Sequence, residues 1–124
     1  MRREGLACDR YNRLHPTEEV KQPWIEQLLG KATVPVIAVS DNMAAVPDMI
    51  RQWVSGHFTV LGTDGFGRSD TREALRRFFE IDGAAIALAA LSSLVREGTI
   101  EGEVYAKAQE AFGVSTDRND ITEL

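Results

Sequence analysis

Two short runs of nearly continuous apolar residues mark the pattern of this chain, at residues 33–40 (TVPVIAVS) and 57–63 (HFTVLGT). Short β-branched runs of this kind are typical of strands that are covered on both faces in a parallel sheet. Between the runs, apolar residues recur three or four positions apart, as expected for one face of a helix, at Met43, Val46, Ile50 and Trp53. The pattern therefore predicts strand, helix and strand, a βαβ unit whose two strands are parallel.

The helix between the strands is expected to run from a cap at Asp41 to about Trp53. Pro47 lies in its middle, and proline cannot donate the backbone hydrogen bond that a helix interior requires. We therefore expect this helix either to start late or to bend.

Helices are also predicted on both sides of the βαβ unit. Before it, residues 2–14 form a weak helical pattern that ends ahead of Pro16. Residues 21–30 form a shorter one, with an apolar face of Trp24, Leu28 and Ile25 and with Gly30 closing it.

Three more helices are predicted after the βαβ unit. Asp70 and Glu73 have the spacing of a capping box and open the first, and residues 83–97, with the segment AAIALAAL, form an apolar helix that we expect to be covered nearly all round. Thr99 is placed to cap a third helix that ends at Gly113. Residues 114–124 are polar and are expected to be a flexible tail.

This inventory predicts an α/β fold that is short of strands. A two-stranded sheet is marginal by itself, and parallel strands depend on lateral neighbours and on helices over both faces. We therefore expect residues 1–124 to be a single, partial domain whose sheet is completed by polypeptide outside it or by another chain.

Composition limits the classes of partner that this domain is expected to bind. The chain has 124 residues, 44% of them hydrophobic, with a formal net charge of −5 and basic residues scattered in pairs, which argues against nucleic acid. No run reaches the length of about 18 apolar residues that crosses a membrane, and no signal sequence is visible at the start. The single cysteine, Cys8, excludes an internal disulfide and favours a reducing compartment, so we expect a cytoplasmic protein with no membrane partner.

The loop LGTDGFGRSD, residues 61–70, is the main candidate for a functional element. Its glycine spacing lacks the G-x-G-x-x-G order of a dinucleotide site and the G-K-[ST] of a P-loop. It still follows a strand and precedes a helix, where open α/β sheets place ligands and contacts. It is either a tight turn with glycines at positive φ or a contact surface, whose candidate residues are Asp64, Phe66, Arg68, Ser69, Asp70 and Arg72.

No self-contained active site or metal site is predicted. His15 and His57 have no cysteine, histidine or carboxylate at ligand spacing, so each is expected to be an ordinary solvated or hydrogen-bonded side chain. Cys8 is expected to be an unreactive thiol, and Trp24 and Trp53 are expected to pack in a core or an interface. We therefore assign no catalytic, cofactor-binding or metal-binding residue.

One long segment resembles a known family. The run LGTDGFGRSDTREALRRFFEIDGAAIALAALSSLVREGTI, together with CDRYNRLHP, PWIEQLL and VIAVSDNM, is similar to the C-terminal part of homodimeric bacterial pyruvate dehydrogenases. The resemblance extends from about Arg3 to Phe112 and includes the specific motif GTDGFGRSD followed by LRRFFEID. It implies a transketolase C-terminal domain: three α/β/α layers around a mixed five-stranded sheet, some of whose strands precede this segment.

The resemblance also implies a division of labour. Thiamine diphosphate and magnesium belong to the preceding domains of such an enzyme, so this chain alone is expected to bind neither and to be inactive. It would support the remaining domains and the second protomer of a homo-oligomer, and serve the lipoyl acyltransferase core only indirectly. Two alternatives remain open: a free-standing interaction or regulatory module of the same fold, and the tail of another 2-oxo acid dehydrogenase, against which the loop motif argues.

Overall fold

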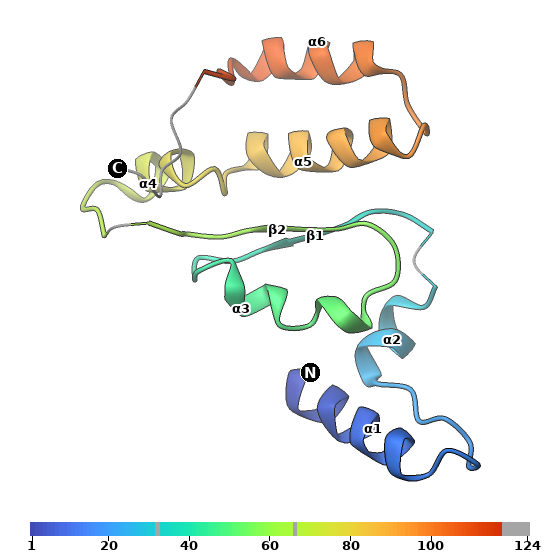
Figure 1. Ribbon diagram of the computed structural model, residues 1–124. Coiled ribbons are helices and arrows are strands. Elements are labelled where there is room, and N and C mark those ends of the chain that lie inside the picture. Colours follow the sequence, from blue (N-terminus) through green and yellow to red (C-terminus); the bar gives the residue numbers. More distant parts are fainter. Residues whose placement is uncertain (32, 66, 118–124) are drawn as a thin grey trace.

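The structure, a computed structural model, describes residues 1–31, 33–65 and 67–117. Its elements run from the N-terminus at one end of a stack of layers to α6 at the other (Figure 1). In chain order they are α1 (Arg2–Leu14), α2 (Trp24–Leu29), β1 (Val36–Val39), α3 (Ala45–Asp48), the 3-10 helix η1 (Arg51–Trp53), β2 (Phe58–Leu61), α4 (Arg72–Phe78), α5 (Gly83–Arg96) and α6 (Gly102–Phe112).

The predicted βαβ unit is confirmed. β1 and β2 pair in parallel, with Val36 opposite Phe58 and Val39 opposite Leu61. They form the two-stranded sheet of the described residues, so the mixed five-stranded sheet expected from the family resemblance is represented here by two parallel strands. The strand shortage expected from the sequence is thus present in the structure.

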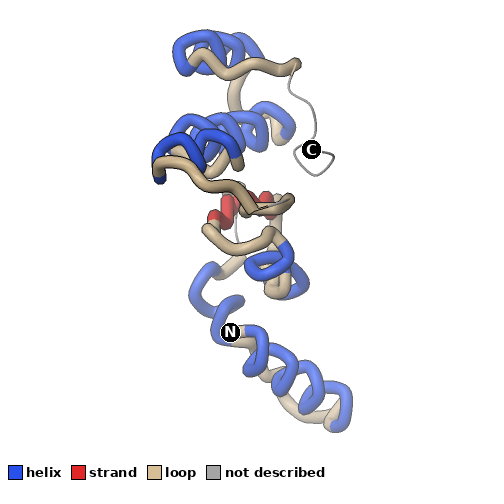
Figure 2. Tube along the Cα trace, turned by 90° about the vertical axis from the view of Figure 1, so that its left-hand side faces the viewer, coloured by secondary structure: helices blue, strands red, loops and turns tan. Residues whose placement is uncertain are grey.

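Helices lie on both faces of this small sheet, as Figures 1 and 2 show from two directions. α5 packs on one face against β1, and α6 packs on the outer side of α5. α3 and η1 lie on the opposite face, and α1 and α2 lie beyond them. The predicted α/β/α layering is therefore confirmed for a sheet that is incomplete.

The helix between the strands differs from the prediction of one helix capped by Asp41. α3 begins only at Ala45, with Ala44 at its N-cap, and a turn separates it from η1. Pro47 explains the late start, because its missing N–H and fixed φ are tolerated within the first turn of a helix but not in its interior. Asp41 is exposed, and its carbonyl accepts a hydrogen bond from the Thr63 hydroxyl at 2.9 Å.

Two further predicted caps were wrong by one or two residues. Thr71, not Asp70, caps α4: its hydroxyl accepts the Ala74 N–H at 3.2 Å, while the Asp70 carboxylate accepts the Thr71 N–H at 2.8 Å. Thr99 ends α5 instead of starting α6, because its N–H donates to the Leu94 carbonyl at 2.9 Å while Gly98 takes φ +74°. This is a Schellman motif, and α6 consequently begins later, with Glu101 at its N-cap.

The cap of α4 gives a direct test of this correction. Thr71→Ala is expected to lower the free energy of unfolding by about 1 kcal/mol, because it leaves the Ala74 N–H without its acceptor. Asp70→Ala, at the position that the sequence pattern favoured, is expected to cost less because Asp70 accepts only from the neighbouring Thr71 N–H. Urea unfolding of both variants measures the difference. A larger loss of stability in Asp70→Ala would instead support Asp70 as the cap, as the capping-box spacing predicted.

The core is small. Its buried apolar residues are Ile25, Trp53, Phe58, Ile81 and Leu88. The prediction that α5 is covered nearly all round was wrong for the described chain, since only Leu88 and Ser93 of that helix are buried. The predicted face of α2 was also wrong in part: Ile25 is buried, but Trp24 and Leu28 are exposed. Both differences leave apolar surface uncovered.

The C-terminal tail falls mostly outside the described residues, which end at residue 117 of the predicted 114–124 segment. Val114 is tied to α6, because its N–H donates to the Gln109 carbonyl at 3.3 Å. The flexibility of the segment stays a prediction.

Candidate functional site

The first half of the loop after β2 is held against the loop after β1. The Thr63 N–H donates to the Asn42 carbonyl at 3.0 Å, and the Asp64 carboxylate accepts the Ala44 N–H at 3.0 Å. Asp64 is half-buried. It therefore connects the two loops at the carboxyl ends of the strands, and it lies further inside than a surface contact residue would.

Glycine has two different roles in this loop. Gly65 takes φ +112°, as expected for a turn glycine. Gly62 is needed for close approach instead, because a Cβ at this position would lie 2.4 Å from the Ala44 nitrogen and 2.6 Å from its Cα. Gly67 has nothing within 4 Å of the equivalent position. The prediction of positive φ is thus confirmed for Gly65, whereas Gly62 is required because a side chain there would collide with the Ala44 backbone.

The second half of the loop is open to solvent. Arg68, Ser69 and Asp70 are exposed, and the Arg68 guanidinium lies 4.3 Å from the centre of the Phe78 ring on α4. Arg72 is exposed in the first turn of α4, and Phe66 lies outside the described residues. The structure thus separates Asp64 from Arg68, Ser69, Asp70 and Arg72, whose contact role stays a prediction.

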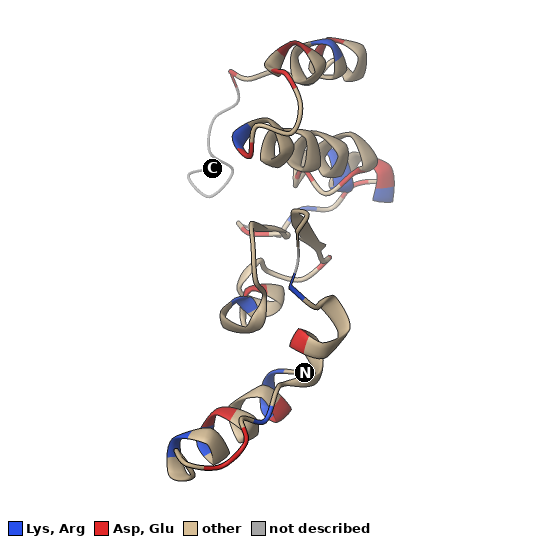
Figure 3. Ribbon diagram, turned by 90° about the vertical axis from the view of Figure 1, so that its right-hand side faces the viewer, with Lys and Arg blue, Asp and Glu red and all other residues tan. Residues whose placement is uncertain are grey.

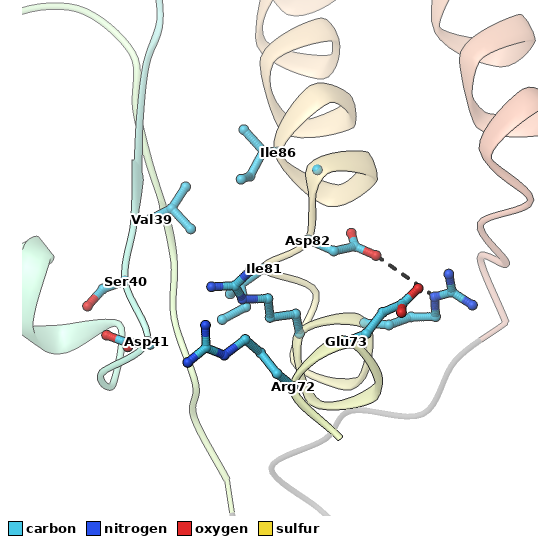
Figure 4. Close-up of a pocket in the computed structure, with 11 residues that line it drawn as sticks. Val39, Ser40, Asp41, Arg72, Glu73, Ile81, Asp82 and Ile86 are labelled. Atoms are coloured by element: carbon cyan, nitrogen blue, oxygen red, sulfur yellow. Dashed lines mark ion pairs between the residues drawn. The ribbon is translucent and has the colours of Figure 1, made fainter. Parts of the chain in front are cut away.

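An open cleft of about 710 Å³ lies between the carboxyl end of β1 and the α4–α5 segment (Figure 4). Apolar side chains of Val39, Ile81 and Ile86 form part of its wall, and Arg72 and Arg76 line it from α4. Asp82 also lines it, accepts the Ala85 N–H at 2.9 Å as the cap of α5, and lies 4.0 Å from the Arg77 guanidinium. Of these residues, the sequence predicts only Arg72 as a contact candidate. The spacing of four between Arg72 and Arg76, which places them on one side of α4, was the available signal.

Charge is unevenly distributed around this cleft. Charged residues gather on α1 and around α4, whereas α5 is almost free of them (Figure 3). Within residues 72–96, one 18-residue window is long and apolar enough to cross a membrane by length and composition alone. The structure breaks this stretch into α4 and α5, with Glu80 at φ +56° between them and Asp82 capping α5. That break favours two helices that cover a sheet.

The loop after β2 does not fit a diphosphate site, and the described acidic side chains do not fit a magnesium site. They contain no group of three or more His, Cys, Asp or Glu side chains that could hold a metal. In the loop, the Thr63 amide and the Asp64 carboxylate already have partners within the chain. We therefore derive no catalytic step through thiamine diphosphate from this chain.

The cysteine, the two histidines and the two tryptophans show no arrangement that suggests catalysis in the described chain. Burial raises the pKa of the Cys8 thiol, and its hydrogen bond to the Glu4 carboxylate, at 3.3 Å, raises this pKa further. A raised pKa lowers the thiolate fraction that a nucleophile needs. His15 stacks on Tyr11 with ring centres 4.2 Å apart, and His57 is exposed. Trp53 is buried in the core as predicted, whereas Trp24 is exposed.

Comparison with known proteins identifies what this arrangement is similar to. The sequence profile described as the transketolase-like TK C-terminal domain matches residues 10–82, more than half of the chain. The chain is 48% identical to the pyruvate dehydrogenase E1 component of Pseudomonas aeruginosa over 97% of its own length. It is 46% identical to the E1 component of Mycolicibacterium smegmatis over 92% and 41% identical to that of Escherichia coli K12 over 94%.

The match covers a small part of each relative. The chain spans 14% of the Pseudomonas protein, 12% of the Mycolicibacterium protein and 13% of the Escherichia protein. Most of each relative therefore has no counterpart in these 124 residues.

Proposed function

This chain belongs to the family of transketolase-like C-terminal domains, and from that premise we propose that it is the C-terminal domain of a pyruvate dehydrogenase E1 component. The observation that carries the proposal is the combination of 92–97% coverage of this chain with 12–14% coverage of the relatives. A match of that size is what is expected if this chain corresponds to one domain of the larger enzyme. An independent interaction module of the same fold is not favoured by these matches.

In this proposal the parent enzyme decarboxylates pyruvate on thiamine diphosphate with magnesium and passes the acetyl group to a lipoyl group. The described residues contain no group of three or more His, Cys, Asp or Glu side chains that could hold the magnesium. The domain instead supports the other domains and the second protomer of a cytoplasmic homodimer, and acts on the lipoyl acyltransferase core only through them. The exposed residues Arg68, Ser69, Asp70 and Arg72 are the proposed contact with those domains.

The proposal is tested by grafting. A chimera in which this chain replaces the matching C-terminal region of the Pseudomonas E1 component is expected to decarboxylate pyruvate. The E1 component truncated before that region, the matched control, is expected to be inactive. The 124-residue chain alone is expected to give no decarboxylation and no saturable thiamine diphosphate binding in calorimetry. A clear binding isotherm with the isolated chain, or a folded dimeric chimera without activity, would contradict the proposal.

A further inference from the structure

The cleft at the carboxyl end of β1 contains positive charges that the chain itself does not use. Arg72 and Arg76 line it from α4, four positions apart, and both side chains are exposed. Among the described residues, neither guanidinium has an ion-pair or hydrogen-bond partner. Like charges at this spacing repel each other, so the pair does not stabilise α4. Within the described chain, both charges are therefore available to an anion.

The acidic side chains of the cleft divide into two groups. Figure 4 shows Arg72 extending toward Asp41 and the end of β1, whereas Glu73 and Asp82 lie on the side away from the strand. Asp82 is already engaged as the cap of α5 and as a neighbour of the Arg77 guanidinium. Asp41 is exposed, and in the described chain only its backbone carbonyl, not its carboxylate, has a hydrogen-bond partner. One carboxylate without a partner thus lies on the strand side of the cleft.

A hydroxyl group and an apolar lining complete the site. The Ser40 oxygen accepts the Asn42 N–H at 3.1 Å, which leaves its O–H and one lone pair for a ligand. The apolar lining consists of Ile81, which is buried, and of Val39 and Ile86. The volume of about 710 Å³ is typical of small-molecule sites, and open α/β sheets place such sites at the carboxyl ends of their strands.

We propose that this cleft binds a free amino acid with a branched apolar side chain, of the size of leucine. Its carboxylate accepts hydrogen bonds from Arg72 and Arg76, whose planar guanidiniums suit a carboxylate. Its ammonium group donates to the Asp41 carboxylate and the Ser40 oxygen, and its side chain packs on the apolar lining. A zwitterion matches both kinds of unpartnered charge, whereas a simple carboxylic acid or a simple amine would match only one. The inference does not depend on the proposed function, since it concerns groups of this chain alone.

An NMR titration of the isotope-labelled 124-residue chain tests the proposal. L-leucine is expected to bind with a dissociation constant of the order of 1 mM, as for a small ligand in an open cleft. It is expected to shift the amide signals of Ser40, Asp41 and Ile81 saturably. Isocaproate lacks the amino group, isoamylamine lacks the carboxylate and glycine lacks the side chain. Each is therefore expected to bind about tenfold more weakly than leucine.

Two variants assign the charged groups. Arg76→Gln is expected to weaken leucine binding about fivefold and to leave isoamylamine binding unchanged. Asp41→Asn is expected to weaken leucine binding about fivefold and to leave isocaproate binding unchanged. Arg76 is chosen because Arg72 also belongs to the proposed domain contact. Both substituted residues are exposed, and the described hydrogen bond of Asp41 uses its backbone carbonyl, so the fold is expected to persist. Arg10→Gln, at an exposed position of α1, is the matched control and is expected to change neither affinity.

Several outcomes would overturn the inference. A titration without saturable shifts well above millimolar leucine would exclude the site. Isocaproate that binds as tightly as leucine would remove the role of Asp41, and isoamylamine that does so would remove the role of the arginines. Equal weakening in Arg10→Gln would indicate a nonspecific effect of net charge. An active chimera together with a chain that does not bind leucine refutes this inference alone, whereas leucine binding together with an inactive chimera refutes only the proposed function.

Discussion

Gly62→Ala is expected to lower the free energy of unfolding by about 3 kcal/mol, the upper part of the range for inserting atoms into a packed site. The added methyl would lie 2.4 Å from the Ala44 nitrogen, 2.6 Å from the Ala44 Cα and 2.9 Å from the Asn42 carbonyl oxygen. All three are backbone atoms, so no flexible side chain can move aside. The two loops would have to separate, which would stretch the hydrogen bond between the Ala44 N–H and Asp64.

The same loop offers the control. Gly67→Ala is expected to leave stability within about 0.5 kcal/mol, because nothing lies within 4 Å of its Cβ position and its φ is not positive. Urea unfolding of both variants measures the difference. Equal effects would mean that the close approach of the two loops is not maintained in solution.

The glycine motif shows how far the sequence could predict this site. Its position after a strand and before a helix was sufficient to locate the loop, and its spacing was sufficient to argue against a phosphate site. Which glycine needs space and which needs positive φ depends on the loop after β1, twenty residues earlier, and periodicity carries no information about such a contact. For the same reason Asp64 was expected at the surface, although its carboxylate serves the Ala44 N–H.

The helices show a similar limit. The elements and their order followed from the apolar spacing, because each helix has its own pattern of burial. The helix ends could not be predicted to the residue, because neighbouring polar residues can each cap a helix. Thr71 caps α4 where Asp70 was expected, and the Thr99 N–H closes the last turn of α5 instead of starting α6. Pro47 gave a genuine alternative, and the late start rather than the bend is what the structure has.

The sequence could predict that part of the sheet lacks neighbours, but not which part. A two-strand inventory was enough to expect missing neighbours, but not to say which edge is open. That distinction depends on Arg51, whose guanidinium reaches both Asp48 and the Phe58 carbonyl. The segment AAIALAAL was expected to be buried because of its composition, and its partial exposure in the described chain agrees with a domain whose other parts lie elsewhere.

Trp53→Ala is expected to be the most destabilising of the single substitutions considered, lowering the free energy of unfolding by about 4 kcal/mol. Trp53 is only 4% exposed, and its indole N–H lies 3.1 Å from one Asp9 carboxylate oxygen and 3.2 Å from the other. The α1 backbone at Gly5 lies so close to the ring that a Cβ there would be 2.6 Å from it. Removing the ring therefore leaves a cavity between η1 and α1, and the Asp9 carboxylate loses the indole N–H while it keeps the hydrogen bond from the Gln52 side-chain amide at 3.0 Å.

Trp24→Ala is the matched control, because it removes the same ring from a position that is 51% exposed. It is expected to cost no more than about 1 kcal/mol in the isolated chain. Urea unfolding followed by circular dichroism compares the two variants without relying on tryptophan fluorescence. Amide exchange in α1 adds a local readout, since loss of the Trp53 contact is expected to speed exchange throughout residues 5–14 while Trp24→Ala leaves it unchanged. Equal losses of stability in the two variants would contradict the assignment of Trp53 as the side chain that fastens α1 to the sheet layer.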